Sequence, residues 1–217
     1  MRKPISIPTA NTVEAWFFRH GESVGNVGGF TSDPSTIDLT PKGKLQAERI
    51  SHAFEHEPNV IVVSPYLRAW LTALPTMKRY PRIPVQKWCI QEFTYLSPCS
   101  CENTTPTMRQ PLVQAYWQRG DPLYIDGPGA ESFAQFVQRV KSCKERCEML
   151  VGRTVLFTHS QFIHGIMMAL SSEGLSNDRD SMSRFRAFNL SLEIPNAAYV
   201  AVRFAGYSTA VSGVMGC

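Results

Sequence analysis

The strongest constraint on the fold is an alternation of short apolar runs with segments of helical period. The apolar runs lie at residues 13–18, 61–63 and 154–158 and are rich in aromatic and β-branched residues. Short runs of this composition are typical of strands that are buried in a parallel sheet. Because parallel strands need right-handed helical crossovers, the alternation predicts an α/β fold: a three-layer sandwich whose mostly parallel sheet carries helices on both faces.

Local signals give the expected element boundaries. A weaker strand is expected at residues 85–90 and a final strand at residues 197–204, and a long helix with a clear apolar stripe follows Ser132. Pro75 should kink or end the helix in which it lies, because proline lacks the amide donor of the helical ladder. The expected helix starts are Thr40-Pro41, Ser64-Pro65, Ser132, and Ser160 or Gln161.

The segment at residues 93–129 departs from this alternation. It has five prolines and no long clean period, apart from a short helix expected around residues 108–117. We interpret it as a lid or subdomain, at about residues 93–130, inserted into a single domain that spans residues 1–217. Its aromatic side chains either stack on a substrate or form a small core within the lid, which is the interpretation we favour. They are Tyr95, Tyr116, Trp117 and Tyr124.

The composition is that of a globular protein, with 43% hydrophobic and 18% charged residues in 217. No apolar run approaches the roughly 20 residues of a membrane span. The start, Met1-Arg2-Lys3-Pro4, lacks the apolar region of a secretion signal, so we expect a cytoplasmic location and no membrane partner. The net charge of +4 is scattered and matches no nucleic-acid motif; a small anionic substrate and chance explain it equally well. The oligomeric state stays open.

Six cysteines raise the question of disulfides or a zinc site. Cys99 and Cys101 are too close for an easy mutual bridge, and they lack both the two-residue gap and the histidine partner of a usual zinc site. Cys143 and Cys147 are four residues apart on an expected helix. Without a secretion signal, we expect free thiols in a reducing compartment and no bound metal.

Charged side chains and imidazoles follow the expected strands. Arg19 and His20 come directly after the first strand, and Arg68 comes shortly after the second. Glu92 lies just past the third strand and His159 ends the fourth. Because open α/β sheets bind ligands at the carboxyl ends of their strands, we expect these five residues at one rim. Two arginines at that rim favour an anionic ligand such as a phosphate.

The blocks that carry these residues resemble those of a known family. Their order and spacing over almost the whole chain are similar to the histidine phosphatase superfamily, also called the phosphoglycerate mutase-like family. The matching blocks are Arg19-His20-Gly21-Glu22-Ser23-x-x-Asn26, Asp38-Leu39-Thr40-x-x-Gly43-x-x-Gln46-Ala47, Ser64-Pro65-x-Leu67-Arg68-Ala69, Glu131-Ser132 with Arg139-Val140, Thr158-His159 and Pro195-Asn196. Ser160 and Ala130 stand where the family has glycine, which puts the local backbone near His159 and Glu131 in doubt.

The resemblance implies a metal-independent phosphomonoesterase that acts on a small phosphorylated metabolite and needs no cofactor. In this scheme His20 attacks phosphorus and forms a phosphohistidine, and Glu92 protonates the leaving oxygen and later deprotonates water. Such an acid needs a raised pKa. The phosphate-binding residues implied by the resemblance are Arg19, Asn26, Arg68, His159 and Ser160.

Several alternatives stay open. The region between the acid and Ser132 has two separated arginines, Arg109 and Arg119, instead of the tandem pair of the family's mutases, so we favour a phosphatase over a mutase-type transferase. A catalytically weak, phosphate-dependent binding module is the third possibility. The alternative acids are Glu22, Glu102 and Glu131, and the histidines expected to be structural are His52, His56 and His164, of which His164 is the one close enough to support the site.

Overall fold

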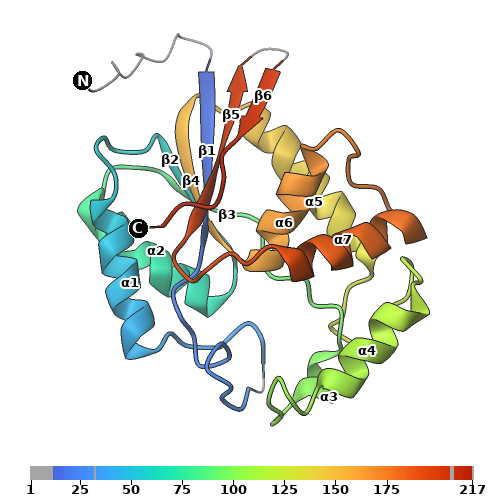
Figure 1. The fold of residues 1–217 in the computed structure, drawn as a ribbon. Helices are drawn as coiled ribbons and strands as arrows, with labels where there is room; N and C mark the ends of the chain where they lie inside the picture. The colour runs from blue at the N-terminus through green and yellow to red at the C-terminus, as the bar shows by residue number, and fades with distance from the viewer. Residues whose placement is uncertain (1–11, 32, 206–207, 217) are drawn as a thin grey trace.

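The computed structural model describes residues 12–31, 33–205 and 208–216, and within them the chain forms the expected three-layer α/β sandwich (Figure 1). A six-stranded sheet, in the order β3-β2-β4-β1-β5-β6, lies between two groups of helices. The strands are β1 (Thr12–Arg19), β2 (Val60–Val63), β3 (Val85–Lys87), β4 (Gly152–Thr158), β5 (Tyr199–Ala205) and β6 (Ser208–Val211). The helices beside the sheet are α1 (Pro41–His52) and α2 (Leu67–Arg79) on one face, and α5 (Phe133–Glu148), α6 (Ser160–Ala169) and α7 (Arg179–Ser191) on the other.

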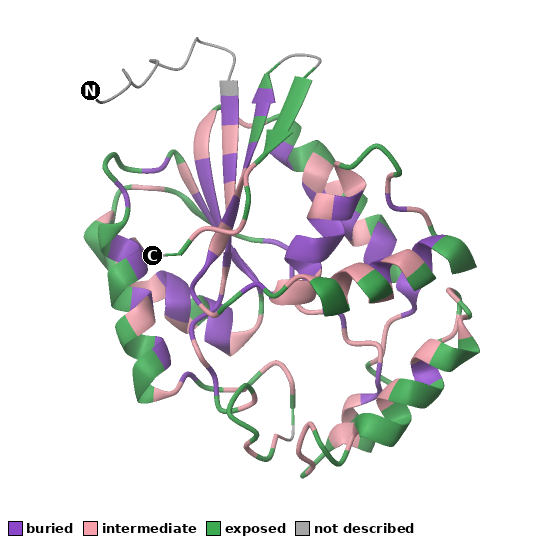
Figure 2. Cartoon of the chain, in the orientation of Figure 1, coloured by how far each residue is buried: buried purple, intermediate pink, exposed green. Residues whose placement is uncertain are grey.

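Each face of the sheet has its own hydrophobic cluster. Successive residues of β1 point to opposite faces, as the two-residue period of a strand requires. Phe17 therefore packs with the α5–α7 side, and Phe18 packs with the α1–α2 side. Figure 2 shows the buried residues concentrated on the central strands and on the helix sides that face them.

The register of the parallel strands brings the predicted site segments together. Arg19 pairs with Thr158 in β4, and the His20 amide donates to the Thr158 carbonyl at 3.0 Å. On the other side of β4, the Ser64 amide donates to the carbonyl of Phe157. The ends of β1, β4 and β2 are therefore neighbours at one rim, as expected. The prediction of a mostly parallel sheet is confirmed, since β1 to β4 are parallel and β5 and β6 are antiparallel.

Some boundary predictions were wrong. Of the two outcomes expected at Pro75, a kink or an end of the helix, the end does not occur, because α2 continues to Arg79 with Thr76 buried beyond the proline. The same helix begins at Leu67, after an N-cap at Tyr66, and not at Ser64-Pro65. Strand β3 covers three residues of the expected six. The sequence analysis also missed α3, α7 and β6.

The segment 93–130 lies beyond the carboxyl ends of the strands and contains α3 (Pro98–Cys101) and α4 (Gln110–Arg119) (Figure 1). The short helix expected near residues 108–117 is α4, which buries Tyr116 alone. Tyr116, Tyr95 and Trp117 pack around Phe93 in the same cluster as α5 and α7. The expectation of a separate core within this segment is therefore wrong; its aromatic residues extend the main core.

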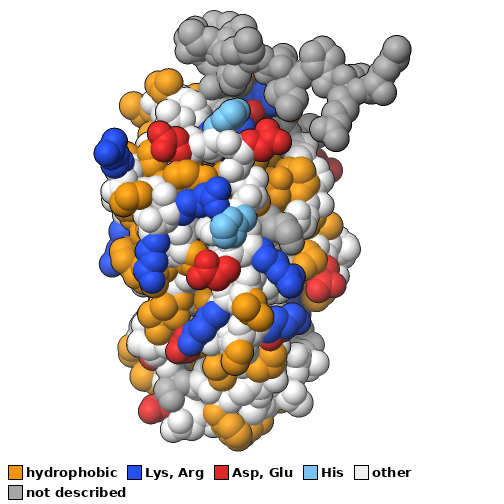
Figure 3. All heavy atoms as spheres, turned by 90° about the vertical axis from the view of Figure 1, so that its left-hand side faces the viewer, with side chains coloured by type: hydrophobic (Ala, Val, Ile, Leu, Met, Phe, Trp, Pro, Cys, Tyr) orange, Lys and Arg blue, Asp and Glu red, His pale blue; other side chains and the backbone are white. Residues whose placement is uncertain are grey.

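The surface charges and the cysteines of the described residues give no indication of a further functional site. Positive and negative side chains are interspersed on the face that carries α1 and α2 (Figure 3). Among the helices that the structure describes, none combines the length and apolar character needed to span a bilayer. The five cysteines within the described ranges are free thiols, and those ranges hold no group of three or more metal-binding side chains. The start Met1-Arg2-Lys3-Pro4 and Cys217 lie outside the described residues.

Candidate active site

His20 is buried where β1 ends, and its ring is fixed by two hydrogen bonds. Its Nδ1 lies 2.7 Å from the Gly21 carbonyl oxygen, which can only accept, so the proton is on Nδ1. Its Nε2 is then unprotonated and accepts from Arg68 Nε at 3.0 Å. Burial, and after it the charges of Arg68 and Arg19, lowers the pKa of His20 well below its usual range. The imidazole is therefore neutral and offers a lone pair on Nε2.

The turn after His20 requires glycine because α1 packs directly against it. A Cβ on Gly21 would lie 2.5 Å from the Gly43 carbonyl oxygen, and a Cβ on Gly43 would lie 2.0 Å from the Glu22 carbonyl oxygen. The Gly21 amide also donates to Thr72 Oγ1 in α2. These contacts explain both glycines and hold the backbone that orients His20.

Arg68, in the first turn of α2, lies at the centre of the site and is buried. Besides its bond to His20, it donates from Nη1 to the Pro34 carbonyl at 2.6 Å. Its guanidinium lies over the Tyr66 ring, 5.0 Å from the centroid. Arg19 is anchored from the other side, where its Nη1 donates to the Ile194 carbonyl at 2.6 Å. Two cations therefore lie close enough to His20 for their charges to affect its ring.

His159 is the N-cap residue of α6 and is fully buried. Its ring centroid lies 5.1 Å from that of His20, and its Nε2 hydrogen-bonds with Ser64 Oγ at 2.8 Å. Burial and the nearby Arg68 charge lower the pKa of His159 well below its usual range. The unliganded site therefore holds His159 neutral, and a bound phosphate dianion would favour its protonation.

Glu92 is the carboxylate that the structure brings to this cluster. Its Oε1 accepts from the Gln161 amide at 3.0 Å, near the positive N-terminus of α6, and from its neighbour Phe93 at 3.4 Å. Burial raises the pKa of Glu92, and the charges of Arg68 and Arg19 oppose that rise. The carboxyl is thus favoured as a proton donor, and the two arginines link it to the His20 side of the site.

The alternative acids have other partners. Glu131 forms a side-on pair with Arg139, and Glu22 binds Lys42 and Thr40, which together lower the pKa of Glu22. Glu102 is exposed in segment 93–130 and does not line the cavity. Among the four glutamates considered, Glu92 is therefore the candidate acid.

Asn26 is oriented by three donors to its side-chain oxygen. The amide and hydroxyl of Ser23 and the Nδ2 of Asn196 all contact Asn26 Oδ1 at 3.0 Å. With Oδ1 occupied, Asn26 has its Nδ2 hydrogens left to donate. Ser160 begins α6 and is half-buried next to His159. Asn26 is therefore linked through Asn196 to the His20 carbonyl, and Ser160 directly follows His159.

Three contributors were missed by the sequence analysis. Asn196 Nδ2 donates to the His20 carbonyl at 3.1 Å as well as to Asn26, and so joins the segment before β5 to the end of β1. Ser64 bonds to His159, and Tyr66 packs edge-on against the same ring. Ser64 and Asn196 belong to blocks that resemble the family, which was the available signal. His164 donates to the Leu192 carbonyl at 2.9 Å and to none of the site side chains; His52 and His56 are exposed.

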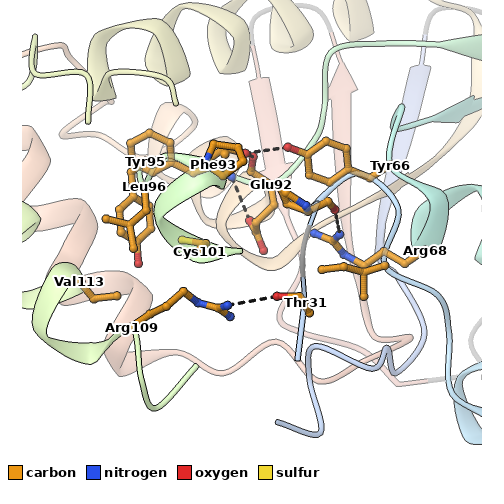
Figure 4. A pocket seen from close by; sticks show the side chains of 14 residues that line it. Thr31, Tyr66, Arg68, Glu92, Phe93, Tyr95, Leu96, Cys101, Arg109 and Val113 are labelled. Carbon is orange, nitrogen blue, oxygen red and sulfur yellow. Dashed lines mark hydrogen bonds between the residues drawn. The ribbon is translucent and has the colours of Figure 1, made fainter. Parts of the chain in front are cut away.

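A cavity of about 180 Å³ opens between this cluster and segment 93–130 (Figure 4). Arg68, Tyr66 and Glu92 line one end, and Arg109 reaches across from α4's N-terminus to Thr31. The Arg109 Nη1 bonds to Thr31 Oγ1 at 3.1 Å and to Thr104 O and Oγ1, while the Thr31 amide donates to the Thr104 carbonyl. The other arginine of segment 93–130 considered in the sequence analysis, Arg119, lies over the Tyr124 ring and does not line the cavity.

Solved structures of other proteins share the fold of this chain. A putative alpha-ribazole-5'-P phosphatase from Escherichia coli str. K-12 substr. MG1655 is similar in structure, with a TM-score of 0.72 and 19% identity over 94% of this chain and 97% of that chain. A phosphoserine phosphatase mutant from Entamoeba histolytica, in complex with phosphoserine, gives 0.66 and 18% over 93% and 96%. A mycobacterial glucosyl-3-phosphoglycerate phosphatase gives 0.65 and 19% over 88% and 90%.

At these identities the structural likeness shows a shared fold. A search of curated proteins returns no match. A family model gives more specific information than the shared fold. The model described as "Histidine phosphatase superfamily (branch 1)" matches residues 15–212, which include both histidines and both arginines of the site. The chain therefore belongs to the histidine phosphatase superfamily (branch 1), and its enzyme class is that of a phosphatase.

Proposed function

We propose that the protein is a metal-independent phosphomonoesterase that forms a phosphohistidine at His20. The observation that supports this most directly is the fixed tautomer of His20, with Nδ1 donating to Gly21 and the Nε2 lone pair facing Arg68. That lone pair is what an attack on phosphorus requires. When the substrate enters, the Arg68 donor that now contacts Nε2 is free to move to a phosphoryl oxygen.

In the first step, His20 Nε2 forms a bond to phosphorus as the ester P–O bond breaks. Glu92, protonated at this stage, gives its proton to the departing oxygen. In the second step, the Glu92 carboxylate takes a proton from water, whose oxygen attacks phosphorus and releases the His20 lone pair. The proton taken from water returns Glu92 to its starting protonated form, and the departure of inorganic phosphate then frees the site for the next turnover.

Charge neutralisation in this scheme comes from side chains. Arg19 and Arg68 supply two permanent positive charges, and His159 and the Asn26 amide supply further donors. We therefore expect hydrolysis of p-nitrophenyl phosphate to be unchanged after treatment with excess EDTA. Activity lost with EDTA and restored by a divalent cation would contradict the metal-free mechanism.

The opposed pKa shifts of His20 and Glu92 predict a pH optimum. With ordinary pKa values of 6.5 and 4.5, a neutral imidazole and a protonated carboxyl would hardly coexist. The site lowers the pKa of His20 and raises the pKa of Glu92, so the pH ranges of the two reactive forms move toward each other. We expect kcat/KM to fall on the acid side as His20 is protonated and on the alkaline side as Glu92 ionises.

The variant Glu92→Gln separates these limbs. Glutamine cannot titrate, so the alkaline limb that belongs to the enzyme should disappear, and kcat/KM should fall by about 10² to 10⁴. The limb that belongs to the second ionisation of the substrate phosphate should stay. A Glu92→Gln variant that keeps the full bell-shaped profile would assign the acid to another group.

We propose a small phosphorylated metabolite as the substrate, since the cavity of about 180 Å³ suits a compact organic part. The cavity is lined by apolar and aromatic side chains together with the charged groups of Arg68, Glu92 and Arg109. A release assay for inorganic phosphate over a panel of phosphorylated metabolites tests this. A mutase would instead move phosphate between positions of phosphoglycerate, and a binding module would bind phosphate esters without turnover.

A further inference from the structure

We propose that Arg139, braced by Glu131, is the positioning residue that holds Glu92 in place for proton transfer. This inference rests on the proposed role of Glu92 as the acid. Glu92 lies between β3 and α3, in a segment with no helix or strand to fix its backbone. A catalytic acid on such a segment needs another source of rigidity, because a displacement of about 1 Å costs about 10²-fold in rate.

Arg139, on α5, supplies that rigidity through all five of its N–H groups. Nη1 donates to the carbonyls of Gln91 at 2.7 Å and Cys89 at 3.4 Å. Nη2 donates to the Glu92 carbonyl at 3.2 Å, and the remaining two donors bind Glu131. An arginine has five N–H donors in a rigid planar fork, so these five bonds leave its guanidinium fully occupied.

Glu131 fixes both the arginine and the far side of the Glu92 segment. Its carboxylate accepts side-on from Arg139, at 2.8 Å from Nε to Oε2 and 2.6 Å from Nη2 to Oε1. The same Oε1 accepts from the Thr94 amide at 3.1 Å, and the Glu131 amide donates to the Thr94 carbonyl at 2.9 Å. The backbone is therefore held at Glu92 itself and on each side of it.

The pair formed by Arg139 and Glu131 is largely shielded from solvent. The Arg139 guanidinium lies near the rings of Phe136 and Phe162, at 4.9 and 5.2 Å from their centroids, and 12% of its side chain is exposed. Arg139 contacts neither His20 nor Arg68. Its hydrogen bonds therefore act on the reaction through the Glu92 segment, where they fix the distance between the carboxyl and the leaving oxygen. Its charge also contributes, less than burial and Arg68, to the lowered pKa of His159.

The variant Arg139→Met tests this through the leaving group. An alkoxide needs a proton as it departs, whereas p-nitrophenolate leaves readily without one. We expect kcat/KM to fall by about 10²-fold for an alkyl phosphate and by less than about tenfold for p-nitrophenyl phosphate. The parameter kcat/KM reports the steps up to the phosphoenzyme, so a slower second step does not mask the difference. Arg139→Lys, a point charge without the fork, should recover part of the loss.

Two comparisons separate positioning from general damage. Arg153 is a matched control, because it also pairs with a glutamate, Glu14, and lies over an aromatic ring, that of Trp16. Arg153→Met should lower kcat/KM equally, if at all, for both substrates. Glu131→Gln is a milder change than Arg139→Met and should show the same dependence on the leaving group. It therefore serves as the test if Arg139→Met prevents folding.

The double variant Arg139→Met, Glu92→Gln gives the decisive outcome. If Arg139 acts through Glu92, adding Arg139→Met to Glu92→Gln should cause no further loss of kcat/KM on alkyl phosphates. Additive losses, or equal losses on both substrates, would overturn the positioning role. If Glu92→Gln alone shows no dependence on the leaving group, the proposed acid is wrong, which is a separate result.

Discussion

Replacing His20 by alanine is expected to lower kcat for p-nitrophenyl phosphate by about 10⁴-fold or more, the scale of loss when a covalent nucleophile is removed. The neighbouring His159 is not expected to take over, because its Nε2 is bound to Ser64 Oγ. The residual rate should come from the arginines, which still bind and polarise the phosphate. Steady-state hydrolysis of wild type and His20→Ala measures the loss.

The intermediate gives an independent readout of the same prediction. Wild type mixed rapidly with radiolabelled substrate and denatured in alkali should retain label that is lost on acid treatment, as a phosphohistidine does. His20→Ala should retain none. The matched control is His56→Ala, since His56 is exposed and should leave both turnover and labelling unchanged. Labelling that persists in His20→Ala would place the nucleophile elsewhere.

The site could be predicted from the sequence where its geometry follows from strand order. Arg19, His20 and His159 end adjacent parallel strands, so the register that buries Phe17 and Phe157 also brings these residues together. Arg68 follows because α2 starts within four residues of β2. The apolar pattern of the strands is a local signal, and in this part of the fold it also determines which distant residues lie together.

The contacts that hold the site depend on segments far apart in the sequence, and no local signal predicts them. Glu92 is held by Arg139, 47 residues away, and the His20 carbonyl by Asn196, 176 residues away. Next to Asn196, Ala197 adopts a φ of 65°, which alanine rarely takes, and its amide donates to the same carbonyl. These contacts depend on how distant segments pack together, which cannot be deduced from local patterns in one sequence.

The missed elements have a related cause. Helix α7 is polar on average and buries few residues, among them Met182 and Phe185, so it lacks a clear apolar stripe. Its best local signal is the N-cap Asp178, whose side chain accepts from the Ser181 amide. Strand β6 is exposed along its whole length and has no alternation for a sequence pattern to detect.

Replacing Arg68 by alanine is expected to lower kcat/KM by about 10³-fold, because this residue contacts the nucleophile and lies next to the acid. Arg68→Lys should recover only part of the loss, since an ammonium keeps the charge but not the planar fork that contacts both His20 Nε2 and the Pro34 carbonyl. Lys78→Ala is the control, because it removes a positive charge from an exposed position of the same helix.

The pH profile of Arg68→Ala should also change, and in a stated direction. The Arg68 charge contributes to the lowered pKa of His20, so its removal should raise that pKa and move the acid limb of kcat/KM to higher pH. The same charge opposes the raised pKa of Glu92, so the alkaline limb should move to higher pH as well. A shift of both limbs to higher pH, with the profile of Lys78→Ala unchanged, would show that the Arg68 charge acts on both His20 and Glu92. A loss of activity at constant pH profile would instead limit Arg68 to binding the phosphate.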